Sequence, residues 1–203
     1  MKKYRYRESL PDLLTSSSAV VFLLVYSFAV AAQEDFEKGR QLFEKGQLAA
    51  AQQFFESVMT GDPQHAEAAW YLGRICFVGE EYDQAIAWFE KAVQIDEANA
   101  AYHLWLGRGY GYRAMRASVW RQFFLARKVR AHFERAVELD PHNVEARADL
   151  MAYYLKAPGI LGGSLEKARS QAEEIKKRDA ERGREAAEMI AEAEGHSVQL
   201  QRD

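Results

Sequence analysis

The chain of 203 residues is poor in the residues that stop helices or crosslink a fold, with four prolines and one cysteine. A lone cysteine, Cys76, cannot form a disulfide within the chain, and its apolar surroundings predict a buried, unreactive thiol. So few prolines leave most of the length able to form helices, which the abundant Ala, Glu, Gln, Leu and Arg favour. The formal net charge is only −3, which gives no indication of a nucleic-acid partner.

Motifs that would indicate catalysis or cofactor binding are also missing. The five histidines show no metal-ligand spacing, and no serine lies in G-x-S-x-G. The segment Gly159–Lys167 holds glycines and a lysine but does not match the phosphate-binding pattern G-x-x-x-x-G-K-[ST], so its Pro-Gly and Gly-Gly pairs indicate turns. We therefore expect no enzyme, no cofactor and no metal site.

What the sequence does contain is a fixed period of 34 residues. Gly39, Gly73 and Gly107 are spaced by this interval. The same interval separates three further pairs: Ala51 and Ala85, Phe55 and Phe89, Asp62 and Asp96. A period of this length indicates a helix-turn-helix unit that is stacked repeatedly, because one unit cannot bury its own apolar face.

The order of small and large residues within one period points to a known family. The positions that carry it are Trp70, Leu72, Gly73, Ala85, Phe89 and Ala92, and this order resembles the tetratricopeptide repeat. The resemblance implies an all-α, right-handed solenoid of about four repeats followed by a C-terminal capping helix. It also implies a non-enzymatic scaffold for protein–protein interaction, although these repeats bind many unrelated partners.

We place a repeat domain over residues 33–203, with repeats at about 32–65, 66–99, 100–143 and 144–179 and a capping helix at 180–195. The expected helices include Gln33–Lys45, Leu48–Thr60, Glu67–Val78, Tyr82–Ile95 and Val144–Ala157. Gly46 is the expected left-handed cap of the first of them. Two departures stand out. The third repeat is ten residues longer than the others, and Met151 replaces the recurrent glycine in the fourth.

The ten extra residues lie in the segment Arg113–Arg130, which has six basic residues and no acidic one. Apolar residues recur every four positions there, which predicts a longer second helix. Two interpretations remain open. Either Trp120, Phe123 and Phe124 are core and the arginines a solvated face, or the segment protrudes and contacts a partner or an anionic membrane surface.

In the family that the repeats resemble, the first helix of each unit lines a concave groove. The resemblance therefore implies a partner-binding surface made by Arg40, Arg74, Arg108, Phe36, Trp70, Phe77, Leu104 and Tyr112. Three arginines in a row suit carboxylates, which predicts an acidic protein or peptide partner. The alternative is that the arginines pair with Glu37, Glu44 or Glu67 on neighbouring turns.

The N-terminal 32 residues differ from the rest. Four basic residues precede the apolar run Ala19–Val30, and Ala29 and Ala31 place small residues at its end. The run has about 12 residues where a spanning helix needs about 20, which favours a cleaved signal peptide and a bacterial periplasmic protein. The alternative is an uncleaved anchor over Thr15–Ala32, which would make the chain a membrane-tethered adaptor with the basic segment near lipid.

Overall fold

The computed structural model describes residues 36–200, and their side chains as far as residue 195. The chain divides into two units, Met1–Ala51 and Gln52–Asp203. In the first unit, a helix over residues 36–44 ends in a turn at Gly46, whose φ of 72° is left-handed as expected. The helix α2 (Leu48–Gly61) begins directly after this turn. The predicted signal peptide or anchor lies outside the described residues.

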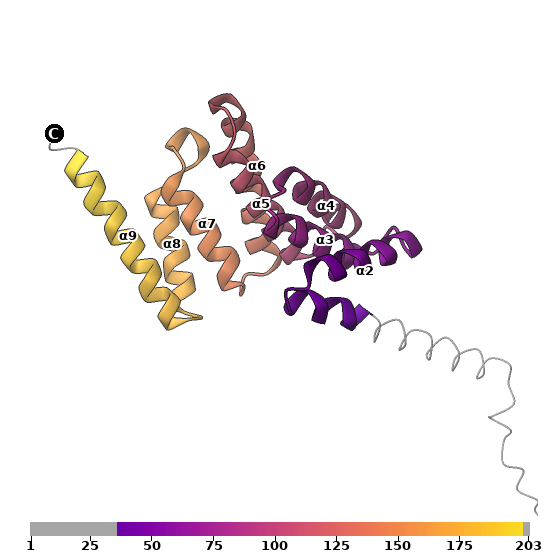
Figure 1. Ribbon diagram of the computed structural model, residues 1–203. Coiled ribbons are helices and arrows are strands. Elements are labelled where there is room, and N and C mark those ends of the chain that lie inside the picture. Colours follow the sequence, from indigo (N-terminus) through magenta and orange to yellow (C-terminus); the bar gives the residue numbers. More distant parts are fainter. Residues whose placement is uncertain (1–35, 201–203) are drawn as a thin grey trace, which may run out of the picture. The chain divides into compact units, whose positions relative to one another are not determined.

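The second unit is a succession of antiparallel helices (Figure 1), and the described part of the chain contains no strand. After α2 come α3 (Ala66–Val78), α4 (Tyr82–Ile95), α5 (Ala100–Met115), α6 (Val119–Leu139), α7 (Val144–Lys156), the short 3₁₀ turn η1 (Gly159–Leu161), α8 (Leu165–Lys176) and α9 (Ala180–Leu200). Each helix packs mainly on the one before and the one after it. The prediction of an all-α repeat solenoid is confirmed.

The turns between repeats are built in the same way three times. Asp62, Asp96 and Asp140 each accept a hydrogen bond from the backbone N–H two residues later. Three residues after each aspartate, the side chain of His65, Asn99 or Asn143 caps the next helix. These local bonds satisfy helix-end N–H groups that would otherwise lack partners. Residues that recur in the sequence therefore form the same turn in each repeat.

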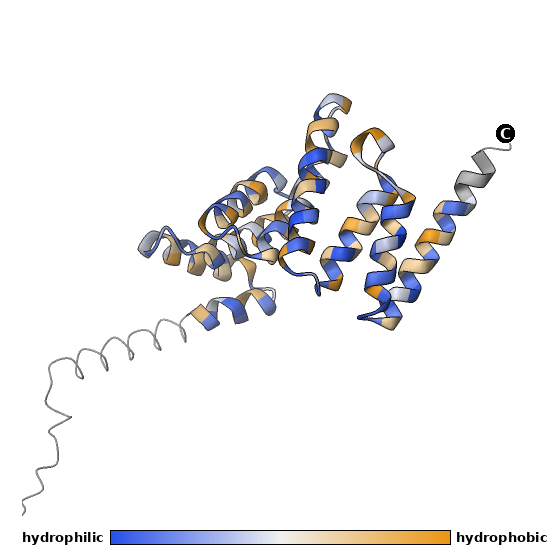
Figure 2. Cartoon of the chain, turned by 180° about the vertical axis from the view of Figure 1, so that it is seen from behind, coloured by the Kyte–Doolittle hydropathy of each residue, from blue (hydrophilic) through white to orange (hydrophobic). Residues whose placement is uncertain are grey.

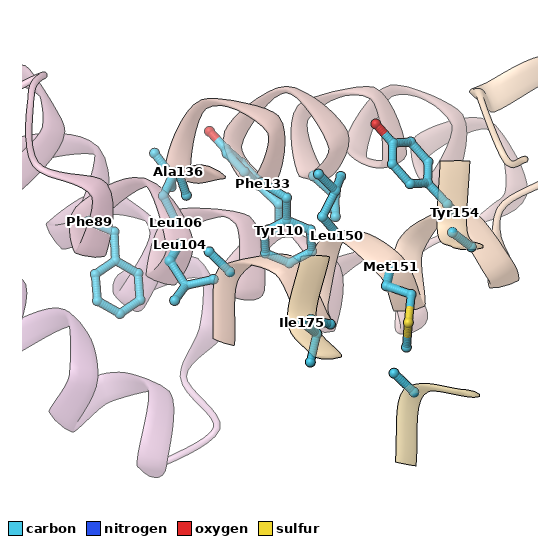
Figure 3. Close-up of a cluster of buried hydrophobic side chains, with 14 of the residues drawn as sticks. Phe89, Leu104, Leu106, Tyr110, Phe133, Ala136, Leu150, Met151, Tyr154 and Ile175 are labelled. Atoms are coloured by element: carbon cyan, nitrogen blue, oxygen red, sulfur yellow. The ribbon is translucent and has the colours of Figure 1, made fainter. Parts of the chain in front are cut away.

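Within a repeat, the two helices meet where a glycine faces a phenylalanine. A Cβ atom built on Gly73 would lie 2.5 Å from two ring carbons of Phe89, and one on Gly107 would lie 2.6 Å from the ring of Phe133. Both rings belong to the buried cluster in Figure 3, and Phe89 is fully enclosed. The missing side chain on one helix therefore makes room for the large one on the other.

The ten extra residues of the third repeat lengthen its helices and leave its loop unchanged. Helix α5 is three residues longer than α3, and α6 is seven residues longer than α4. The longer second helix is confirmed. The interpretation of Trp120 and Phe124 as core is wrong, because their exposed fractions are 83% and 66%. These residues lie on turns that extend past the ends of α3 and α4, so no neighbouring helix covers them.

The loop between α7 and α8 forms turns, as its glycine pairs predict. Gly162 has a left-handed φ of 92°, and a Cβ on Gly163 would lie 1.7 Å from a backbone carbonyl oxygen. Tyr153 and Arg130 both donate hydrogen bonds to the carbonyl oxygen of Leu161, at 2.8 and 3.4 Å. Contacts from α6 and α7 thus hold the loop in place.

The last helix covers the end of the second unit through one face. Ala186 and Ile190 are buried, whereas the neighbouring Ala187 is exposed. Arg169 on α8 donates to Glu194 on the outer part of α9. Cys76 is 9% exposed, which confirms the prediction of a buried cysteine, and this burial raises the pKa of its thiol. None of the helices in residues 36–200 combines the length and the apolar character that crossing a bilayer requires.

Candidate functional site

The second unit contains an open hollow of about 790 Å³ lined by α5, α6, α7 and the loop after α7, with Phe77 of α3 at its side. Each helix presents one face to it, because the lining residues recur every three or four positions. On α5 these are Trp105, Arg108, Tyr112 and Met115, and on α6 they are Gln122, Ala126, Val129 and Phe133. Met115 and Gln122 belong to the added turns of the third repeat, so the insertion deepens one wall of the hollow.

The opposite wall comes from α7 and the loop that follows it. Helix α7 contributes Asp149, Tyr153 and Lys156, and the loop contributes Pro158 and Leu161. The carbonyl oxygen of Leu161 accepts hydrogen bonds from α6 and α7, which join this wall to both helices. The lining is mainly apolar and aromatic, which is the character of sites that take an apolar group and orient it with a few polar contacts.

An ion pair crosses the floor of the hollow. The Nε atom of Arg108 donates to Asp149 at 2.5 Å, and its Nη2 atom lies 3.2 Å from Glu145. Burial raises the pKa of the Asp149 carboxyl, while the adjacent guanidinium acts in the opposite direction. Two carboxylates therefore already engage the charge of Arg108, and it offers an acidic ligand little additional attraction.

Arg74 and Arg108 alternate with two indole rings. The guanidinium carbon of Arg74 lies 4.7 Å from the ring centre of Trp70 and 4.8 Å from that of Trp105. The guanidinium carbon of Arg108 lies 4.9 Å from Trp105, on the next turn of α5. Cation–π contacts of this kind favour a fixed orientation of both partners. They make the arginines part of the wall beside the hollow.

The structure brings together three of the residues that the groove prediction named. Phe77, Arg108 and Tyr112 all line the hollow, and the rings of Phe77 and Tyr112 meet edge to face at 5.0 Å. Leu104 was expected on the partner-binding surface, but it is only 3% exposed and belongs to the core. The next residue, Trp105, faces the hollow in its place.

Arg40 and Phe36 belong to the first unit and are described there. The guanidinium carbon of Arg40 lies 5.5 Å from the ring centre of Phe36, and its Nη1 atom lies 3.6 Å from Glu37. This is one of the pairings on a neighbouring turn that the alternative interpretation named. For Arg108 pairing is also observed, but with acidic residues of α7 instead of neighbours on its own helix.

Sequence reasoning missed the residues of the wall made by α7. One side of α7 carries Asp149, Tyr153 and Lys156, at spacings of four and three. This spacing shows that they share a helix face, but it does not show which part of the chain that face contacts. Trp105 was missed because the family's pattern places Leu104 in the groove. A one-residue shift moves a side chain by about 100° around a helix, which is enough to exchange core and groove.

The fold and the hollow define the class: the chain is a helical repeat protein with a preformed groove. Residues 42–108 match the tetratricopeptide repeat family model. Mouse superkiller complex protein 3 is 29% identical over 166 residues, which is 80% of this chain but 10% of that protein. The chain thus spans about a tenth of the length of this curated relative.

Two solved structures share the fold. A thermophilic tetratricopeptide repeat protein of Thermus thermophilus superposes with a TM-score of 0.63 and 19% identity, covering 83% of this chain and 84% of the other. YrrB, a tetratricopeptide repeat protein with an unusual peptide-binding site, gives 0.58 and 20% identity over 88% and 93% of the two chains. Residues 42–108 therefore resemble the tetratricopeptide repeat, and the fold is shared with solved tetratricopeptide repeat proteins.

Proposed function

We propose that the chain is a binding scaffold whose groove takes an extended segment of a partner protein, with one bulky apolar side chain in the hollow of about 790 Å³. The observation that carries this proposal is the mainly apolar lining between α5 and α7, which includes several aromatic rings. A peptide-binding relative with the same fold supports it. Burying a large apolar side chain contributes about 1.5–3 kcal/mol, which makes this side chain the main anchor.

The charges at the hollow suggest where an acidic group of the partner would lie. Arg108 is engaged by Asp149 and Glu145, whereas the exposed Lys156 lines the hollow and makes no ion pair with any residue in the described range. A carboxylate of the bound segment, from a side chain or a C-terminus, would meet Lys156 at the rim. The proposed partner segment is therefore apolar at its anchor and acidic beside it.

Filling the hollow tests the groove without removing any native contact. Gly111 lines the hollow, and a Cβ built on it meets nothing within 4 Å, so Gly111→Phe should fold and occupy the space. Peptides selected from a displayed random library on the wild type should bind this variant more weakly by about 2 kcal/mol, or roughly thirtyfold. Fluorescence anisotropy with labelled peptides measures the change.

The matched control is Gly195→Phe on α9, where a new Cβ also meets nothing within 4 Å. This variant should bind the selected peptides like the wild type. Lys156→Gln should weaken the binding of acidic peptides and leave purely apolar ones unaffected. Equal binding by the two phenylalanine variants would place the peptides outside the groove. Arg108→Ala is a poor test, because it leaves Asp149 without its ion-pair partner and so changes stability as well.

The second part of the proposal concerns location. The basic head and apolar run of residues 2–30 support export to a bacterial envelope, where the groove would serve assembly or adaptor tasks. The alternative is a retained anchor over Thr15–Ala32. Mass spectrometry of the protein isolated from its cell separates the two: a mature chain that starts at residue 32 or 33 indicates cleavage, and an intact Met1 with membrane fractionation contradicts it.

A further inference from the structure

The turn between α5 and α6 carries large apolar side chains that no other part of the described chain covers. We call Met115, Val119, Trp120 and Phe124 the tip. Their exposed fractions are 69%, 78%, 83% and 66%. Single exposed apolar residues are ordinary, but four within ten residues of sequence at one projecting turn indicate a surface that meets something other than water.

Trp120 and Phe124 of the tip lie on a different face of α6 from the residues that line the hollow. Gln122, Ala126 and Val129 line the hollow, whereas Val119, Trp120 and Phe124 do not. At 100° per residue, Trp120 and Phe124 fall about 40° apart on the helix surface and more than 100° from the lining residues. Trp120 and Phe124 can therefore contact a second surface while the groove is occupied, whereas Met115 also lines the hollow.

A second apolar prominence lies at the same edge of this unit. Ile160, in the turn after α7, is 85% exposed. Figures 1 and 2 show this turn and the start of α6 at the same edge, and orange residues stand among blue ones at both places in Figure 2. A hydrogen bond from Arg130, further along α6, to the carbonyl oxygen of Leu161 joins this turn to the same helix.

The segment around the tip, residues 113–130, has a net charge opposite in sign to that of the rest of the chain. Residues 113–130 carry six positive charges and no negative one, and since the whole chain has a net charge of −3, the other residues together carry −9. Arg113 and Arg116 pair with Asp83 and Glu80. Arg121 and Arg127 are exposed and make no ion pair with the described residues.

We propose that the tip docks on an anionic lipid bilayer, with Trp120 and Phe124 among the headgroups and upper acyl chains and Arg121 and Arg127 at the phosphates. A projecting turn has no cavity of its own and requires none in its partner. A bilayer surface supplies anionic charge and apolar depth without a shaped pocket. Tryptophan in particular favours the membrane–water interface. The groove would then hold its partner protein next to the membrane.

Tryptophan quenching by brominated lipids tests this in the full chain. The four tryptophans are Trp70, Trp88, Trp105 and Trp120. The apolar N-terminal run contains no tryptophan and therefore contributes no tryptophan fluorescence of its own. Vesicles of brominated phosphatidylcholine with about one third phosphatidylglycerol should quench the wild type. Trp120→Phe should still bind, because phenylalanine keeps the apolar anchor, but should lose the quenching.

Partitioning measured by vesicle co-sedimentation completes the test. Replacing Trp120 and Phe124 by serine should lower partitioning by about tenfold or more, the scale of losing buried apolar surface. Arg121→Gln with Arg127→Gln should lower it on anionic vesicles and leave it unchanged on neutral ones. For the wild type, binding should also weaken between about 0.05 and 0.5 M salt, where screening becomes strong.

The matched controls lie on α8 and α9, away from the tip. Met189→Ser removes an exposed apolar side chain, and Arg184→Gln with Lys176→Gln removes the same charge as the arginine pair. Both should partition like the wild type. Quenching that persists in Trp120→Phe, or tip variants that partition like the controls, would overturn the proposal. So would dimerisation that depends on Trp120 together with no vesicle binding, since the tip would then contact a second copy of the chain.

Discussion

Gly73→Leu is expected to lower the free energy of unfolding by about 3 kcal/mol, the upper end of what overpacking a core costs. A Cβ alone would lie 2.5 Å from two ring carbons of Phe89. The ring has no room to retreat, because it is fully buried and its other face meets Gly109, where an added Cβ would lie 3.6 Å away. Leucine would therefore force α3 and α4 apart.

Urea unfolding followed by circular dichroism measures this effect. The control is Gly111→Ala on α5, where a Cβ meets nothing within 4 Å and alanine should stabilise the helix by up to about 1 kcal/mol. The cost of Gly73→Ala should also fall in a Phe89→Leu background, because the smaller side chain vacates the contact. If Gly73→Leu unfolds at the urea concentration of the wild type, the packing of α3 on α4 described above is wrong.

In the fourth repeat, the large side chain is expected on the first helix and the small one on the second, the reverse of Gly73 and Phe89. Met151 takes the glycine position on α7 and is 2% exposed, and Ala172 takes the phenylalanine position on α8 and is 8% exposed. Met151→Gly should lower the free energy of unfolding by about 3 kcal/mol or more, since it leaves a cavity and places glycine inside a helix. Ala172→Phe alone should also destabilise, by overpacking.

The double variant distinguishes exchanged volume from general intolerance of the core. Met151→Gly with Ala172→Phe reproduces the arrangement of Gly73 and Phe89 and should recover most of the stability that each single change loses. Both single variants and the double are compared by thermal and urea unfolding. Simple addition of the two losses would mean that residues 151 and 172 do not share one space, which would contradict this account of the fourth repeat.

Much of the fold could be predicted because its causes are local or periodic. The interval between Gly39, Gly73 and Gly107 reflects one packing contact used again in successive repeats. Gly46 adopts the left-handed turn expected of it, and the helix expected over Tyr82–Ile95 has those bounds in the structure. The insertion after Gly107 lengthens the second helix of its repeat, as the four-residue spacing predicts, since that spacing is itself a property of the helix. That the first helix, α5, is also longer was not predicted.

The candidate site was predicted in part, because helical spacing identifies the residues on one face but not the face of the neighbour that it meets. Arg108 lines the hollow. Its partner Asp149, however, is 41 residues away, and nothing in the spacing within one repeat indicates that contact. For the same reason, the sequence suggested Leu104 where the structure places Trp105.

By itself, the sequence determined the repeat, its helix boundaries and the exchange of small and large residues between paired helices, because each depends on contacts inside a unit of about 34 residues. The tertiary structure decided which charges and rings are available to partners. Arg74 lies between Trp70 and Trp105 because two repeats stack there. Trp120 is exposed while Met151 is buried because the stacking of repeats covers α7 and leaves the added turns of α6 uncovered.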